Sequence, residues 1–294
     1  MTDRPERVWR SLDLVAVTVP YFQRKGVDQP RLTAELLLAH ALGWKRIDLF
    51  TRFEQDLPSD KVDAFRELVR RRAEREPLQH ILGKAAFRML DIRCDRRALT
   101  PRPETEELVT EAVALLTGVE APLVADLGAG TGCIAISLAL ALPAARVVAT
   151  DISAEALDLA RENVAFHKVA DRVRLLRGNL CAPLLAEGLA GLLDLVVSNP
   201  PYVKTSEIAL LEPEVRDYDP RIALDGGPDG LDFYRRILDE ARPLMKPGAA
   251  LALELPEDGA APVSALAAEL GWVQTSVKKD MRNVDRIFSA RRPA

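Results

Sequence analysis

The sequence of 294 residues contains few of the side chains from which metal centres and disulfide frameworks are built. Its only cysteines are Cys94, Cys133 and Cys181. No two of them lie within four residues of one another, a spacing that excludes a zinc knuckle or a disulfide framework. No metal site is therefore expected, and unpaired thiols indicate a reducing compartment such as the cytoplasm.

Long apolar runs are also lacking, which excludes a membrane-spanning helix. No stretch approaches the roughly 18 consecutive apolar residues that a span requires. Residues 1–10 are charged and lack the apolar core of a signal peptide. We therefore expect a protein without a membrane partner, and a content of 48% apolar and 29% charged residues is typical of globular domains.

A strongly basic surface is the third feature that the sequence lacks. The formal net charge is −4, with a small excess of basic side chains in residues 1–84 and a larger excess of acidic ones in residues 85–294. Direct nucleic-acid binding is therefore not expected. The arginine-rich stretch 66–75 is interpreted as the solvated face of a helix, and docking of an acidic partner is the alternative.

Residues 1–84 show the hydrophobic spacing of helices and no clear strand pattern. A first helix is expected to end near Gly26, and a second to run from Pro30 to Gly43. A long helix is expected to begin with Ser59 as its N-cap. Helices that share apolar faces in this way predict a small helical-bundle domain over residues 1–84.

Strand and helix patterns alternate in the rest of the chain. Residues 85–102 predict a linker or β-hairpin, and the main domain is expected over residues 103–294. Its expected strands are 123–127, 146–150, 173–177, 194–198, 249–255, 273–277 and 286–290. This alternation predicts an α/β fold, a Rossmann-like domain with a mainly parallel seven-stranded sheet covered by helices on both faces.

The segment VADLGAGTGCIAISLA (124–139) combines a strand, a glycine-rich turn and a helix. Gly128, Gly130 and Gly132 allow the backbone to turn tightly and to approach a ligand at the helix N-terminus. The dinucleotide fingerprint requires glycine at position 133, where this chain has cysteine, and no Walker Gly-Lys-Ser/Thr follows. The pattern D-x-G-x-G-x-G resembles the loop of adenosylmethionine-dependent methyltransferases. It predicts S-adenosyl-L-methionine as cofactor and S-adenosyl-L-homocysteine as product.

Two carboxylates accompany this turn. The loop residues expected at the cofactor are Asp126, Gly128, Ala129, Gly130, Thr131 and Gly132. Asp151 ends the second strand, where a carboxylate can accept hydrogen bonds from both ribose hydroxyls of a nucleoside. The alternative for Asp151 is a helix N-cap, a role that Ser153 can also fill, and the alternative for Asp126 is orientation of the turn.

The segment SNPPYV (198–203) follows the expected strand 194–198 and contains the candidate catalytic residues. Ligands of open α/β sheets bind beyond the carboxyl ends of the strands, which places this segment beside the cofactor. An amide or exocyclic amino nitrogen needs acceptors for its two N–H groups, and the Asn199 side-chain oxygen and the Pro200 carbonyl can accept them. Pro201 stiffens the turn, and the Tyr202 ring offers a stacking surface. A rigid turn without chemistry is the alternative.

Four stretches resemble the release factor glutamine methyltransferase family (PrmC, also called HemK). They are TPRPETEELV (100–109), DLGAGTG (126–132), SNPPYV (198–203) and ALDGGPDGLDFYRRIL (223–238). The resemblance spans nearly the whole chain. It implies a class I methyltransferase that modifies the side-chain amide nitrogen (N5) of the glutamine in the Gly-Gly-Gln (GGQ) motif of class I peptide chain release factors. It also implies that residues 1–84 recognise the release factor, and we expect a monomer.

The same resemblance implies further site residues. Arg102 and Glu104, together with Asn199, Pro200, Pro201 and Tyr202, are expected to bind the substrate. A favourable position in the first turn of a helix is the alternative for Glu104. Asn199, Asn179 and Leu180 are further expected cofactor contacts. Asn179 and Leu180 stand where the family commonly has an acidic residue followed by an aromatic one, so the adenine contact is expected to be apolar. Pro256 replaces a family glycine, which leaves the role of Glu254 open.

The motif N-P-P-Y does not by itself name a substrate. The alternatives are a glutamine of a ribosomal protein, the exocyclic amine of a nucleobase, and a non-catalytic module that binds the cofactor or a translation factor. The P-R-P-E-T-E stretch separates the family from its nearest relatives. Nucleobase methylases usually carry a basic recognition module, which this acidic chain lacks.

Overall fold

The computed structural model describes residues 8–294, so the first seven residues of the predicted domain 1–84 lie outside the described part. The chain divides into two compact units. The helical unit contains the described chain up to Gly83 and the distant segment Pro213–Tyr218, and the second, α/β unit contains Lys84–Glu212 and Asp219–Ala294. The predicted 85–102 linker is therefore grouped with the α/β unit, and no sequence pattern indicated that residues 213–218 pack with the helices.

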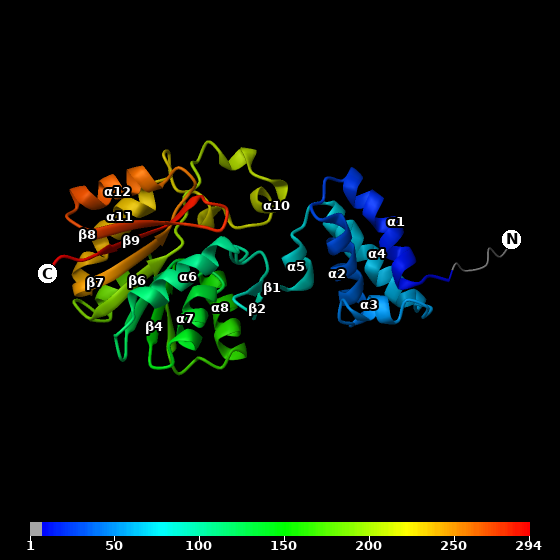
Figure 1. Cartoon of the computed structure of the whole chain (residues 1–294), viewed down its shortest axis with the longest axis horizontal. Coiled ribbons are helices and arrows are strands. Elements are labelled where there is room, and N and C mark those ends of the chain that lie inside the picture. The colour runs from blue at the N-terminus through cyan, green and yellow to red at the C-terminus, as the bar shows by residue number, and fades with distance from the viewer. Residues whose placement is uncertain (1–7) are drawn as a thin grey trace. The chain divides into compact units, whose positions relative to one another are not determined.

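The helices before Gly83 are drawn in blue to cyan in Figure 1. They enclose one apolar core. The helices of the helical unit are α1 (Ser11–Arg24), α2 (Pro30–Leu42), α3 (Asp48–Thr51), α4 (Ser59–Ala73), α5 (Leu78–Leu82) and α10 (Pro213–Arg216). Phe22, Leu37 and Phe65 are among the fully buried residues between them. The prediction that Ser59 is an N-cap is wrong, because Pro58 occupies the cap position with its fixed φ and Ser59 is the first helical residue. None of the helices in the described part of the chain has the length and apolar character needed to cross a membrane.

An ion pair holds the distant segment within the helical unit. The Glu214 carboxylate accepts hydrogen bonds from Arg75 Nε at 2.7 Å and Arg75 Nη2 at 2.6 Å. Arg72 Nη2 donates to the same carboxylate at 2.8 Å, and the Arg72 side chain is buried. The Tyr218 hydroxyl donates to the Glu74 carbonyl at 3.1 Å. A two-pronged guanidinium–carboxylate pair of this kind is both directional and strong.

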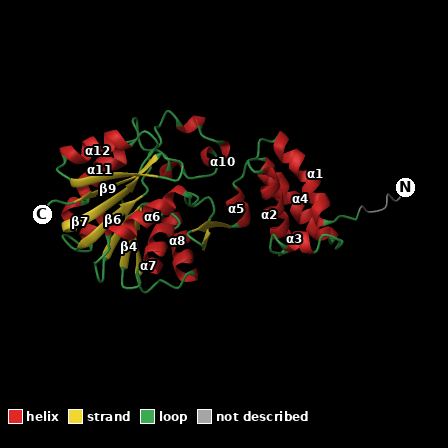
Figure 2. Ribbon diagram, viewed as in Figure 1, coloured by secondary structure: helices red, strands yellow, loops and turns green. Residues whose placement is uncertain are grey.

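The α/β unit contains the predicted seven-stranded, mainly parallel sheet (Figure 2). Its strands are β3 (Leu123–Leu127), β4 (Arg146–Asp151), β5 (Val173–Arg177), β6 (Leu193–Ser198), β7 (Met245–Glu254), β8 (Val273–Lys279) and β9 (Asp285–Arg291). They lie in the order β5-β4-β3-β6-β7-β9-β8, and only the pairs that include β9 are antiparallel. The strand order reverses between β3 and β6, so the segments that follow these two strands lie at the switch point where open sheets bind ligands.

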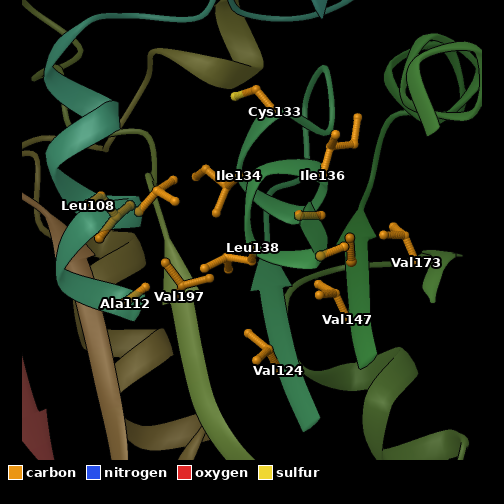
Figure 3. Packing of buried hydrophobic residues seen from close by; sticks show 14 of the residues in the cluster. Leu108, Ala112, Val124, Cys133, Ile134, Ile136, Leu138, Val147, Val173 and Val197 are labelled. Carbon is orange, nitrogen blue, oxygen red and sulfur yellow. The ribbon is translucent and has the colours of Figure 1, made fainter. Parts of the chain in front are cut away.

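Helices cover both faces of this sheet. They are α6 (Glu104–Leu115), α7 (Cys133–Ala141), α8 (Ala154–Phe166), α9 (Ala182–Ala186), α11 (Asp232–Glu240) and α12 (Ala260–Glu269), with short 3-10 turns at Ile208–Leu210, Arg221–Ala223 and Arg242–Leu244. On one face, Leu108 of α6 and Leu138 of α7 pack with Val197 of the sheet (Figure 3). On the other face, α11 and α12 contribute the fully buried Tyr234 and Val263. The confirmed prediction of a two-sided α/β domain rests on these two cores.

A buried asparagine joins the short hairpin of β1 (Lys84–Phe87) and β2 (Leu90–Arg93) to the rest of the unit. Asn163 of α8 accepts from Arg93 N at 2.8 Å through its side-chain oxygen. Its Nδ2 donates to the carbonyls of Arg93 and Thr131, each at 2.9 Å. One side chain therefore holds β2 and the glycine-rich turn against the same helix.

We expect Asn163→Ala to lower the free energy of unfolding by about 2–4 kcal/mol, because it leaves a buried N–H and two carbonyls without their partners. Urea denaturation followed by circular dichroism measures the change. Arg161→Ala on the exposed side of the same helix removes only a surface ion pair with Asp158 and should cost less than about 0.5 kcal/mol. Equal stability of the two variants would contradict the role given to Asn163.

Candidate active site

A cavity lies at the switch point of the sheet, entirely within the α/β unit. Most residues that the sequence singled out line it: Arg102, Gly128, Ala129, Gly130, Thr131, Asp151, Asn179, Leu180, Asn199, Pro200 and Pro201. The parallel pairing of β3 with its neighbours explains why they meet. Leu127 at the end of β3 is level with Thr150 of β4 and Ser198 of β6, so the three following segments leave the sheet together.

Four of the expected site residues lie outside this cavity. Asp126 is fully buried, and Gly132 is the N-cap residue of α7. Tyr202 lines a separate pocket. Glu104 also lies outside, where its carboxylate accepts from Arg282 Nη2 at 2.6 Å. The position of Glu104 in the first turn of α6 agrees with the helix-end alternative and not with a place on the cavity wall.

The glycine-rich turn is held to β4 by its own backbone. Gly128 N and Ala129 N donate to the Thr150 carbonyl at 2.8 and 2.9 Å. Gly128, Gly130 and Gly132 all have positive φ angles, which only glycine adopts readily. A Cβ at Gly132 would lie 3.3 Å from the Cβ of Ala160, so a small residue is also needed for α7 to approach α8. The result is a tight turn that leads directly into the N-terminus of α7.

Asp151 connects this turn to the start of α8. Its Oδ2 accepts from Gly130 N and its Oδ1 from Ser153 N, each at 2.9 Å. The helix cap is Ser153, whose Oγ accepts from Ala156 N at 3.1 Å. The carboxylate of Asp151 is therefore placed on the cavity wall and is not the N-cap of α8.

Asp126 has one carboxylate oxygen bound and one without a partner in the described chain. Its Oδ2 accepts from Ala135 N, in the first turn of α7, at 3.1 Å. Its Oδ1 is buried and has no hydrogen bond. Burial raises the pKa of Asp126 to about 7, and the bond from Ala135 N only partly offsets that effect. The orienting role that the sequence left open for Asp126 agrees with these contacts.

Part of the cavity lining is apolar. It includes Ile152, Leu180 and Phe233. Leu180 has a positive φ of 48°, and its carbonyl accepts from the Thr150 hydroxyl at 3.0 Å. Asn179 Oδ1 accepts from Arg236 Nη1 at 3.1 Å. These contacts fix the segment after β5 with leucine toward the cavity, as an apolar adenine contact requires.

Asn199 stands directly after β6 and begins a chain of two side-chain hydrogen bonds. Its Nδ2 donates to the Thr105 hydroxyl oxygen at 3.1 Å. The Thr105 hydroxyl in turn donates to Glu254 Oε2 at 2.7 Å. Sequence reasoning missed Thr105, although it stands within P-R-P-E-T-E, and left Glu254 open. Both are buried, and only the fold brings them to Asn199.

The Tyr202 ring does not face the cavity. It packs against the apolar core on the α11–α12 side of the sheet and lines a separate pocket with Leu231 and Pro256. Burial raises the pKa of the Tyr202 phenol to about 12, so this hydroxyl stays neutral at physiological pH. The expectation that this ring stacks on the substrate is therefore not supported by its position.

The backbone of the N-P-P-Y segment is fixed by the glycine-rich stretch near residue 226. Val203 N donates to the Leu224 carbonyl at 2.9 Å, and Gly226 N donates to the Val203 carbonyl at 2.8 Å. A Cβ at Gly226 would lie 2.7 Å from the Tyr202 Cα and 2.9 Å from the Pro201 carbonyl oxygen. The sequence offered this stretch only as a resemblance, and close packing on the N-P-P-Y backbone gives it a physical role.

Arg102 lines the cavity but already has a carboxylate partner in the same chain. Its Nη2 donates to Asp219 Oδ2 at 2.7 Å. The other oxygen of Asp219 accepts from both Thr100 N and the Thr100 hydroxyl at 3.2 Å. Asp219 is buried, and the sequence gave no signal that distinguished it.

We expect Asp126→Asn to flatten the pH dependence of stability. A carboxyl whose pKa rises from 3.8 to about 7 on folding binds its proton more tightly in the folded protein, so the free energy of unfolding falls as the pH rises through that window. Asparagine resembles the protonated carboxyl at every pH. Thermal denaturation at pH 5 and pH 8 should show a smaller decrease for this variant than for the wild type. The exposed Asp171→Asn should behave as the wild type, and equal decreases in all three would contradict the assignment.

Two family models match the chain. One is described as the PrmC N-terminal domain and matches residues 13–83, and the other is described as the Methyltransferase small domain and matches residues 108–212. A release factor glutamine methyltransferase of Chlorobaculum tepidum is 41% identical over 289 residues, which cover 97% of this chain and 98% of that protein. One of Geobacter sulfurreducens is 42% identical over 291 residues, which cover 99% of each.

Solved structures show the same fold at lower identity. The hMettl16 catalytic domain, in complex with MAT2A 3'UTR hairpin 6, is 19% identical with a TM-score of 0.57, and the match covers 76% of this chain and 81% of that one. A methyltransferase from Pyrococcus furiosus is 20% identical with a TM-score of 0.50, covering 71% and 92%. At these identities the likeness concerns the fold alone.

Proposed function

The chain belongs to the release factor glutamine methyltransferase family, and we propose that it methylates a release factor. The methyl group comes from S-adenosyl-L-methionine, and the acceptor is N5 of the glutamine in the GGQ motif of a class I peptide chain release factor. The observation that carries this proposal is the placement of Asn199 and Pro200 on one cavity with the glycine-rich turn. Acceptors for an amide and a turn suited to a nucleoside-bearing cofactor thus share one site.

The cavity residues fit the proposed cofactor in chemistry. The N-terminus of α7 and the glycine-rich turn can approach a polar ligand closely, the Asp151 carboxylate can accept from ribose hydroxyls, and Ile152 and Leu180 offer an apolar contact for adenine. The unpartnered Oδ1 of Asp126 lies beneath the same turn. When bound, S-adenosyl-L-methionine supplies an electrophilic methyl group on a sulfonium centre, and the reaction leaves S-adenosyl-L-homocysteine.

The protein has to hold the weakly nucleophilic amide nitrogen in place. Asn199 Oδ1 and the Pro200 carbonyl oxygen accept the two N–H groups of the substrate glutamine in our proposal. As the nitrogen–carbon bond forms and the carbon–sulfur bond breaks, the nitrogen loses one proton to solvent. The prolines and the two backbone hydrogen bonds of Val203, one with Leu224 and one with Gly226, restrict the backbone that carries these acceptors. Acceptors held in place orient the amide and so lower the barrier to methyl transfer.

The helical unit is the proposed recognition part. Its match to the PrmC N-terminal domain over residues 13–83 supports this assignment. Within the arginine-rich stretch 66–75, Arg70 of α4 pairs with Glu67 and Glu74 on an exposed face, as the interpretation of a solvated helix face expects. Arg72 is buried, and together with Arg75, which lies beyond the end of α4, it binds the Glu214 carboxylate. Only part of the stretch therefore agrees with that interpretation.

We expect the purified protein to transfer labelled methyl from S-adenosyl-L-methionine to a class I release factor. The same factor with its GGQ glutamine changed to alanine should remain unlabelled, and mass spectrometry should place one methyl group on that glutamine. Label on both factors would move the acceptor to another residue. Absence of label on both, with S-adenosyl-L-homocysteine bound by the protein, would overturn the proposed substrate and direct the assay to ribosomal proteins.

A further inference from the structure

The hydrogen-bond chain from Asn199 through Thr105 to Glu254 connects three elements of the α/β unit. Asn199 follows β6, Thr105 lies in the first turn of α6, and Glu254 is the last residue of β7. Thr105 is 3% exposed and Glu254 is 1% exposed, so water does not compete freely for either side chain. Only Asn199 and Thr105 reach the cavity, and the carboxylate stands behind them.

The chemistry of the three groups decides which of them donates and which accepts in the two hydrogen bonds. An ionised carboxylate only accepts hydrogen bonds, so the single hydroxyl proton of Thr105 goes to Glu254. The hydroxyl oxygen is then left as an acceptor, and it receives Nδ2 of Asn199. Because an amide carries its donor and its acceptor on opposite branches, this bond turns Oδ1 of Asn199 away from Thr105. The terminal carboxylate therefore decides which branch of the amide is free to accept.

We propose that Thr105 and Glu254 are positioning residues that keep the Asn199 side-chain oxygen, and not its nitrogen, available to the amide of the substrate glutamine. This inference rests on the proposed function of Asn199. An amide turned the other way would present two N–H donors to the two N–H donors of the substrate. The hydrogen bonds that link Asn199, Thr105 and Glu254, called the relay from here on, thus select one orientation of the Asn199 amide. It is the orientation that suits an amide nitrogen as methyl acceptor.

Independent contacts fix the carboxylate end of the relay. The Glu254 carbonyl accepts from the hydroxyl of the fully buried Tyr234 at 2.7 Å. Leu255 N donates to the Arg286 carbonyl at 2.8 Å, and Arg286 Nη1 donates back to the Leu255 carbonyl at 3.0 Å. The backbone at Glu254 and Leu255 is therefore held in place. A fixed carboxylate is needed if it is to decide the direction of the hydrogen bond from Thr105.

The test compares Thr105→Val with Thr105→Ser. Valine keeps the branched shape but removes both hydrogen bonds, whereas serine keeps the hydroxyl. We expect kcat for release-factor methylation to fall about tenfold or more in Thr105→Val, the factor that corresponds to one hydrogen bond of ordinary net strength. Thr105→Ser should stay within about threefold of the wild type, and the affinity for S-adenosyl-L-homocysteine should be similar in all three. Because Thr105→Val leaves the buried Glu254 carboxylate without this partner, its melting temperature should fall, and kcat is compared at a temperature at which all three proteins are folded.

The outcomes separate this inference from the function on which it rests. An active wild type with unchanged kcat in Thr105→Val would overturn the relay and leave the proposed function intact. An equal loss in Thr105→Ser and Thr105→Val would also overturn it, because shape and not the hydroxyl would then matter. A wild type that transfers no methyl group to any release factor would remove the proposed function, and the positioning role with it.

A pH profile provides a readout that a purely structural role would not change. Burial raises the pKa of Glu254 to about 7, and a protonated Glu254 can donate to Thr105 and so reverse the whole chain. The charged and titratable groups that face it are Arg286, Glu104, Arg102, Tyr202, Tyr234 and Cys133. We expect kcat of the wild type to fall as the pH decreases through about 7 more steeply than kcat of Glu254→Gln, which does not titrate. Parallel profiles of the two proteins would contradict the relay.

Discussion

The parallel pairing of β3 with β4 and β6 is the constraint on which the site depends. Level registers at Leu127, Thr150 and Ser198 bring three chain segments to one edge of the sheet at the same height. The reversal of strand order at this point separates the helices on either side and leaves room between the loops. The glycine-rich turn, the Asp151 carboxylate and Asn199 meet because of this pairing, although Gly130 and Asp151 are 21 residues apart in sequence and Asn199 is farther along the chain.

A second layer of residues gives this edge its precision. Asn163 holds the glycine-rich turn to α8, and Gly226 packs against the N-P-P-Y backbone where any side chain would collide. Glu254 and Thr105 orient the amide that faces the cavity. None of these contacts is local in sequence. Each uses a buried polar group or a missing side chain to restrict a neighbour that the ligand is expected to touch.

The sequence predicted local and repetitive features well and long-range polar contacts poorly. Short runs rich in apolar residues located strands such as 123–127 and 173–177 at their observed bounds, because the strands of a parallel sheet that helices cover on both faces are predominantly apolar. The spacing of glycine and proline located the two loops at the cavity, residues 126–132 and 198–203. Asp219 and Glu254 were missed or left open because a single acidic residue has no periodicity, and its partner, 117 or 149 residues away, is known only from the fold. Tyr202 was assigned to the cavity because a motif specifies residue types but not the side to which a ring turns.

The segment Pro213–Tyr218 means that the helical unit is not a separable N-terminal module. The boundary between the units is crossed at Gly83, at Glu212 and again at Tyr218, so the helical unit is discontinuous in sequence. Removal of the chain before Lys84 would leave the Glu214 carboxylate and the Tyr218 hydroxyl without Arg72, Arg75 and Glu74. An N-terminal domain taken from a relative would likewise have to pair with residues 213–218 of this chain. The helical unit is therefore expected to evolve together with residues 213–218, because its folded form includes both parts of the sequence.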